Sequence, residues 1–217
     1  MDSSYYYHMF MRNLLILSWV LVAAGMYIGL VVTPPVDVLG DSYRIFFFHL
    51  PASILAFLSF TVTAAASIMY LRKRDIKWDD IAVSSVKLGF VFGALALLTG
   101  WVFSYAAWGT KWSWDPKVMA TFVMWFVYIG YIILRNSTDE PQRRARQCAV
   151  YGLVGYATVP LAYLSSRLVY SLHPESIGLT PHMQITAFIM VAGFVLLYSY
   201  LLWFNAKLEK ISRSMTS

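Results

Sequence analysis

The stretch LGFVFGALALLTGWVFSYAA, residues Leu88 to Ala107, runs for twenty residues without a charge. A helix rises about 1.5 Å per residue, so about twenty residues cross the roughly 30 Å hydrocarbon core of a bilayer. The stretch is continuously apolar and lacks the period-two alternation of barrel strands. It therefore predicts a helix that spans a membrane.

Five further runs of the same kind accompany this one. Of the 217 residues, 59% are hydrophobic and only 13% are charged, too few charges to cover a soluble domain of this size. The predicted spans are Asn13–Val32, Ile45–Leu71, Leu88–Ala107, Val118–Leu134, Cys148–Ser166 and Met183–Ala206. Because tails and connections are short, we expect an all-α integral membrane protein, with residues 1–217 forming one bundle of six transmembrane helices.

Three residues within or beside the runs carry local predictions. We expect Pro51 at a helix start and Pro160 to kink its helix, because proline has no backbone N–H to donate. Cys148 is the only cysteine, so it cannot form an internal disulfide, and we expect it to serve in packing.

The basic residues are divided unevenly between the two ends of the spans. Thirteen of the 17 lie on the side of both termini and of the connections between spans two and three and spans four and five. The other four are Arg44, Lys111, Lys117 and Arg167. By the positive-inside rule both termini are cytoplasmic and the other three connections face out. This basic rim also explains the net charge of +6 without nucleic acid as a partner.

The outward connections collect aromatic and metal-binding side chains. WGTKWSWDP, residues Trp108 to Pro116, places three tryptophans in one short connection. Three of the four histidines, His49, His173 and His182, fall at the outer ends of spans. A flat apolar platform, two neutral imidazoles and a few cations together describe a haem site, with axial histidines on the iron and cations on the propionates.

Each feature also has a structural interpretation. Tryptophans near a bilayer interface usually form an aromatic belt. That interpretation is natural for four of the tryptophans outside the cluster, Trp19, Trp101, Trp125 and Trp203. A histidine near a span end can cap a helix, and Asp115 before Pro116 is a good helix start. The convergence of all these residues on one side of the membrane favours haem.

WGTKWSWDP resembles the tryptophan-rich WWD signature of the haem-handling membrane proteins of cytochrome c maturation. GDSYRIFFFHLP, Gly40 to Pro51, resembles the segment that opens span two in the CcmC family. A chain of this length with six spans, and with a histidine in each connection flanking the tryptophan connection, is also similar to that family. The resemblance covers nearly the whole chain.

The resemblance implies a protein that handles haem b and is not an enzyme. Carried over to this chain, the axial ligands are His49 in FFHLP and His173 in SLHPE, with His182 as the substitute for the second. The haem platform is then Trp108, Gly109, Trp112, Trp114 and Asp115. The candidates for contact with the propionates are Arg44, Lys111 and Arg167.

The resemblance further implies partners and a location. Members of the family present haem to a small membrane-anchored chaperone, CcmE. They work with the ABC-type subunits CcmA and CcmB and with the small subunit CcmD. The implied location is the cytoplasmic membrane of a bacterium or archaeon, with the haem site facing the periplasm or the outside.

Departures from the family pattern keep other functions open. Lys111 stands where tryptophan is usual, and Asp115 to Lys117 is more similar to the synthetase-type members CcsA and CcmF. A cytochrome c haem lyase of that type would be longer, with more spans. A b-type cytochrome needs ligands deep in its spans. A haem transporter needs a polar route, unless haem enters from the lipid, and Lys87 is the only charge near a span interior.

Reporter fusions test the orientation. A reporter that is active only outside the cytoplasm should be active when fused near Thr110 and inactive when fused after Arg144, because the basic residues hold the second position inside. Activity is measured in whole cells, and fractionation checks that both fusions insert. The reverse pattern would overturn the orientation.

Overall fold

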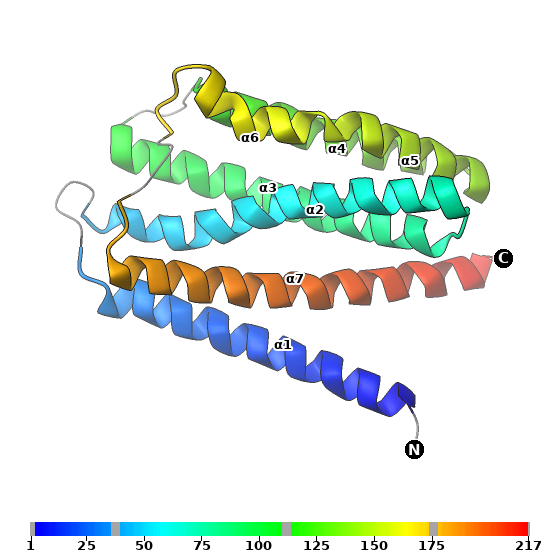
Figure 1. Cartoon of the computed structure of the whole chain (residues 1–217), viewed down its shortest axis with the longest axis horizontal. Helices are drawn as coiled ribbons and strands as arrows, with labels where there is room; N and C mark the ends of the chain where they lie inside the picture. The colour runs from blue at the N-terminus through cyan, green and yellow to red at the C-terminus, as the bar shows by residue number, and fades with distance from the viewer. Residues whose placement is uncertain (1–2, 36–39, 110–113, 174–177, 217) are drawn as a thin grey trace.

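The computed structural model describes residues 3–35, 40–109, 114–173 and 178–216, which fold into a bundle of long helices (Figure 1). The helices are α1 (Ser3–Tyr27, continued by a π-helical turn, Ile28–Val32), α2 (Phe46–Lys73, preceded by a 3-10 turn, Ser42–Ile45), α3 (Lys77–Trp108), α4 (Pro116–Asn136), α5 (Pro141–Tyr156), α6 (Thr158–Leu168) and α7 (Pro181–Thr216). Six segments of the described chain are long and apolar enough to cross a membrane, which confirms the predicted fold class.

Four helices extend well beyond the predicted spans: α1 begins at Ser3 rather than Asn13, α5 begins at Pro141 rather than Cys148, and α3 and α7 are also longer. α3 begins at Lys77 rather than Leu88, and α7 continues to Thr216 rather than ending at Ala206. An apolar run marks only the part of a helix that lipid can surround, whereas the helix itself continues into the polar region. In α3 the first turn carries two aspartates, whose charges complement the positive end of the helix dipole.

Pro51 and Pro160, for which the sequence carried predictions, occupy different positions in their helices. The fifth span is divided at Ala157 into α5 and α6, and Pro160 follows in the first turn of α6. Proline cannot donate to the carbonyl four residues earlier, here that of Tyr156, so the expected interruption is confirmed. Pro51 lies inside α2, in its second turn, so the prediction that it starts the helix is wrong; the helix begins five residues earlier, at Phe46.

The helices pack in an order that differs from their order along the chain. α2 and α3 form the centre, and α2 also contacts α5, while α4 packs on α6. α7 lies against α3 and α2, and α1 packs mainly on α7 at the side of the bundle (Figure 1). Between α2 and α4 the rings of Phe60 and Tyr128 stack with centroids 3.6 Å apart. Cys148 is fully buried in the same core cluster, which confirms its packing role.

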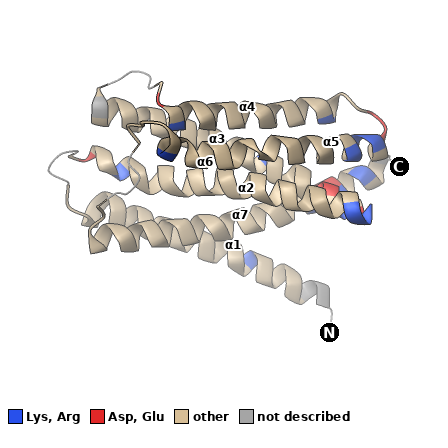
Figure 2. Cartoon of the chain, turned by 45° about the horizontal axis from the view of Figure 1, so that its top comes forward, with Lys and Arg blue, Asp and Glu red and all other residues tan. Residues whose placement is uncertain are grey.

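The two ends of the bundle differ in charge. Both termini and the α2–α3 and α4–α5 connections lie at one end, where lysines and arginines gather (Figure 2); we call it the basic end. The α1–α2, α3–α4 and α6–α7 connections lie together at the opposite end, here called the loop end (Figure 1). The division is the one predicted from the basic residues. Which end faces the cytoplasm stays a prediction.

Buried ion pairs tie the helices together at the basic end. Asp79 at the start of α3 accepts two hydrogen bonds from Arg135 of α4, each 3.0 Å long, with both side chains largely buried. The neighbouring Asp80 pairs in the same way with Arg213 of α7. Lys87, half-exposed, pairs with Glu209 of α7. α3 is therefore held to α4 and α7 by charge as well as by apolar contact.

Removing one partner of the Asp79–Arg135 pair should destabilise the protein strongly, because the other charge would then be buried without a counterion. Arg135→Met leaves a buried carboxylate without its cation, and losing one partner of such a pair costs about 3–5 kcal/mol. The double variant Asp79→Leu/Arg135→Met should recover most of the loss. Thermal unfolding in detergent measures both. Lys77→Ala, which breaks an exposed pair with Asp75, is the control and should change nothing measurable. An unaltered melting temperature in Arg135→Met would contradict the prediction.

Candidate haem site

His49 lies near the start of α2 at the loop end, with its ring against α3. Its Nδ1 is 3.1 Å from the hydroxyl of Thr99, and its Nε2 is 3.4 Å from the hydroxyl of Ser53. The side chain is half-buried. His49 is inside the helix, and the residue that caps α2, Ile45, makes no side-chain cap. The capping interpretation of His49 is therefore wrong.

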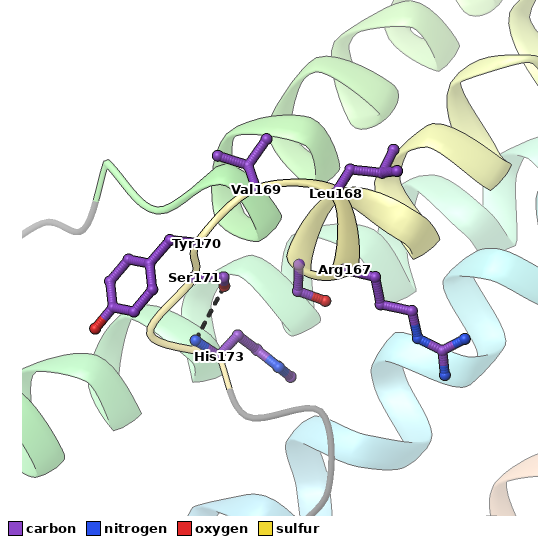
Figure 3. A pocket seen from close by; sticks show the side chains of 7 residues that line it. Arg167, Leu168, Val169, Tyr170, Ser171 and His173 are labelled. Carbon is purple, nitrogen blue, oxygen red and sulfur yellow. Dashed lines mark hydrogen bonds between the residues drawn. The ribbon is translucent and has the colours of Figure 1, made fainter.

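His173 lies in the connection that follows α6, on the rim of an open pocket of about 350 Å³ (Figure 3). The pocket is lined by Ser166, Arg167, Leu168, Val169, Tyr170, Ser171 and His173. His173 and His49 lie at the same end of the bundle although they are far apart in the sequence, one in a connection and one near the start of a helix.

Asp115 joins the two connections that flank this pair. Its carboxylate caps α4 by accepting the backbone N–H of Lys117 at 2.9 Å, as the sequence predicts. The same carboxylate accepts the hydroxyl of Ser171 at 2.8 Å and the backbone N–H of Leu172 at 2.6 Å. The Ser171 hydroxyl oxygen in turn accepts the backbone N–H of His173 at 3.0 Å (Figure 3). A single buried carboxylate therefore sets the position of His173.

The tryptophan connection is described only at its edges. Gly109 ends α3 with a positive φ of 68°, a conformation that glycine adopts without strain. The side chain of Trp114 is 79% exposed. Trp108 closes α3, but its side chain, like all of Lys111 and Trp112, lies outside the described residues. The predicted platform stays a prediction.

The two described propionate candidates occupy different surroundings. Arg44 donates to Asp41 at 2.9 Å and to the carbonyl of Gly29, and its guanidinium lies over the ring of Tyr43. Arg167 lies over the ring of Tyr163 and lines the same pocket as His173. Arg44 is thus held by α1 and its own turn, whereas Arg167 is placed beside one predicted ligand.

Some residues around the site could not be identified from sequence patterns. Thr99, which contacts His49, looks like an ordinary residue of an apolar span, and its only signal is a hydroxyl near the outer end. Ser171 gives no signal at all. Lys117 donates to the carbonyl of Tyr163 at 2.8 Å and so links α4 to α6. His182, the substitute ligand, is exposed in the first turn of α7.

The chain matches the CcmC family, described as heme exporter protein C, over residues 3–217. It is 31% identical to the heme exporter protein C of Bradyrhizobium diazoefficiens in an alignment that covers 82% of this chain and 70% of that protein. The identity to the heme exporter protein C of Escherichia coli K12 is 30%, covering 87% and 78% of the two chains. The identity to the heme exporter protein C of Paracoccus denitrificans is 29%, in an alignment that covers 89% of this chain and 86% of that protein. The similarity therefore extends well beyond single motifs.

The carboxylate of Asp115 should be required to hold the α6–α7 connection. Asp115→Ala removes a helix cap worth about 0.5–2 kcal/mol, and it leaves the donors of Ser171 and Leu172 without their acceptor. We expect a lower melting temperature in detergent and faster tryptic cleavage after Arg167. Asp41→Ala, at an exposed carboxylate, is the matched control. Unchanged melting and cleavage in Asp115→Ala would show that the carboxylate does not join the two connections.

Proposed function

The chain belongs to the CcmC family, heme exporter protein C, and from this premise we propose how it handles haem. As a member it has a role in haem handling for cytochrome c maturation, as a membrane component for haem delivery and not as an enzyme. We propose that the loop end holds haem b as cargo and passes it on to a chaperone.

The observation that carries the proposal is that His49, near the start of α2, and His173, in the connection after α6, lie at the same end of the bundle. The porphyrin supplies four ligands to haem iron, so the protein needs to supply only two. A structural site for a bare metal ion usually needs four protein ligands, and the described part of the chain has no group of three or more His, Cys, Asp or Glu side chains that could hold one. Two imidazoles at one end of the bundle therefore match haem better than a bare ion.

We assign the remaining contacts by what each side chain offers. Trp114 presents a largely exposed indole, and we infer that Trp108, Gly109 and Trp112 complete the apolar platform with it. The carboxylate of Asp115 already accepts hydrogen bonds from backbone N–H groups of α4 and of the α6–α7 connection. We infer that it contributes to the haem platform by holding these segments in place.

Arg167 is the propionate partner that the geometry favours, because it shares a pocket with His173. Arg44 would first have to leave Asp41 and the carbonyl of Gly29. Lys111 is the third candidate and belongs to the tryptophan connection itself.

We infer the orientation of the site from charge and its partners from family membership. We place the loop end outside the cytoplasm because the basic residues gather at the other end. There haem is handed to CcmE, with CcmA, CcmB and CcmD as further subunits of the export complex. An open pocket at the rim of the bundle is consistent with transfer to a partner, since haem could leave it without crossing the helix core.

Spectra of the purified protein test the ligand assignment. His49→Ala and His173→Ala should each lose or shift the Soret band of bis-histidine haem, because each removes one axial ligand. Added imidazole should partly restore the band by filling the vacant position. His182→Ala, at an exposed histidine in the first turn of α7, is the matched control and should keep the wild-type spectrum.

A wild-type spectrum in both single variants would reject His49 and His173 as ligands. If His173→Ala alone kept the spectrum and His182→Ala lost it, the second ligand would be His182.

A further inference from the structure

Two adjacent residues of α3, Thr99 and Gly100, form the surface against which the ring of His49 rests. The Thr99 hydroxyl is 3.1 Å from Nδ1 of the imidazole. A Cβ atom at Gly100 would lie 3.0 Å from Cε1 and 3.4 Å from Nδ1, so a larger residue there would push the ring away. One residue thus offers the ring a hydrogen bond, and the next leaves it room.

The hydrogen bonds of Thr99 decide which ring nitrogen carries the proton. A hydroxyl has a single proton to donate, and that of Thr99 lies 2.7 Å from the carbonyl of Leu95, one turn earlier in α3. With its proton engaged there, the hydroxyl oxygen can only accept from the imidazole. The carbonyl of Ala96 lies 3.3 Å from the same hydroxyl and is a second acceptor for its proton. The imidazole therefore faces a hydrogen-bond acceptor on its α3 side, the oxygen of Thr99.

We propose that Thr99 is a positioning residue that holds neutral His49 with its proton on Nδ1 and so leaves the lone pair of Nε2 for the haem iron. The role of this lone pair rests on the proposed function, whereas the tautomer does not. At Nε2 the Ser53 hydroxyl is 3.4 Å away, beyond the usual range of such bonds, and it can rotate.

The hydrogen-bond partner of the ring nitrogen that does not bind the metal affects how well a histidine ligates. A metal-binding histidine nearly always donates its other N–H to an acceptor, which fixes the ring and makes it a better ligand. Loss of such a partner typically weakens metal binding by about 10- to 100-fold. In this chain the acceptor comes from α3, the central helix, so the orientation of the ring is coupled to the α2–α3 packing.

Paired substitutions at position 99 test the proposal. Thr99→Val keeps the branched shape and removes the hydroxyl, and we expect haem to be lost from the purified protein about 10- to 100-fold more readily. Thr99→Ser keeps the hydroxyl and should behave as wild type. Thr121→Val is the control, because the Thr121 hydroxyl makes the same bond to a carbonyl one turn earlier, that of Lys117. Equal haem retention in Thr99→Val and wild type would overturn the proposal.

A measurement on haem-free protein separates this proposal from the function itself. Nitrogen NMR of ring-labelled histidine reports the tautomer of His49 directly, with His49→Ala used to assign its signals. We expect the Nδ1–H form in wild type and Thr99→Ser and a mixture of tautomers in Thr99→Val. A wild-type ring protonated at Nε2 would overturn the positioning role. If instead His49→Ala left the haem spectrum unchanged, the proposed function would fail even with the expected tautomer.

Discussion

Water is absent from the hydrocarbon core of a bilayer, so every backbone N–H and C=O there must find a partner within the protein. Long helices satisfy this requirement, and at two departures from regular helix a side-chain hydroxyl donates to a backbone carbonyl. At the break in the fifth span the hydroxyl of Thr158 donates to the carbonyl of Gly155 at 2.6 Å. After the π-helical turn the hydroxyl of Thr33 donates to the carbonyl of Ile28 at 2.9 Å. The connections, and with them any binding site made of connections, lie at the ends of the bundle.

The same requirement explains how the loop end is organised. The connections there contribute several backbone donors, and Asp115 collects one from α4 and one from the α6–α7 connection on a single carboxylate. That arrangement fixes the segment containing His173 at the same end of the bundle as His49. The position of His173 is therefore a consequence of satisfying backbone groups at a helix end.

Much of this could be predicted from the sequence, for identifiable reasons. Length and hydropathy set the six spans, and local chemistry set the cap at Asp115 and the break near Pro160. Contacts across the bundle could not be predicted. The contact between Thr99 and His49 depends on the packing of α3 against α2, and the sequence does not indicate that these two helices are neighbours. In the same way, the hydrogen bond from Ser171 to Asp115 depends on the α3–α4 and α6–α7 connections lying together, which the sequence does not indicate either. Helix ends in the polar region were also missed, since hydropathy does not report them.

If His49 and His173 are the axial ligands, their supports differ in kind. His49 is fixed from a helix that packs closely on its neighbour, with α3 on one side of its ring. His173 sits in a connection whose position depends on hydrogen bonds through Ser171 to one carboxylate. A cytochrome that keeps its haem for electron transfer gains from two ligands on rigid helices. A protein that must give haem up gains from one rigid ligand and one that a partner can displace by breaking a few hydrogen bonds. The asymmetry of the two supports is thus what delivery requires.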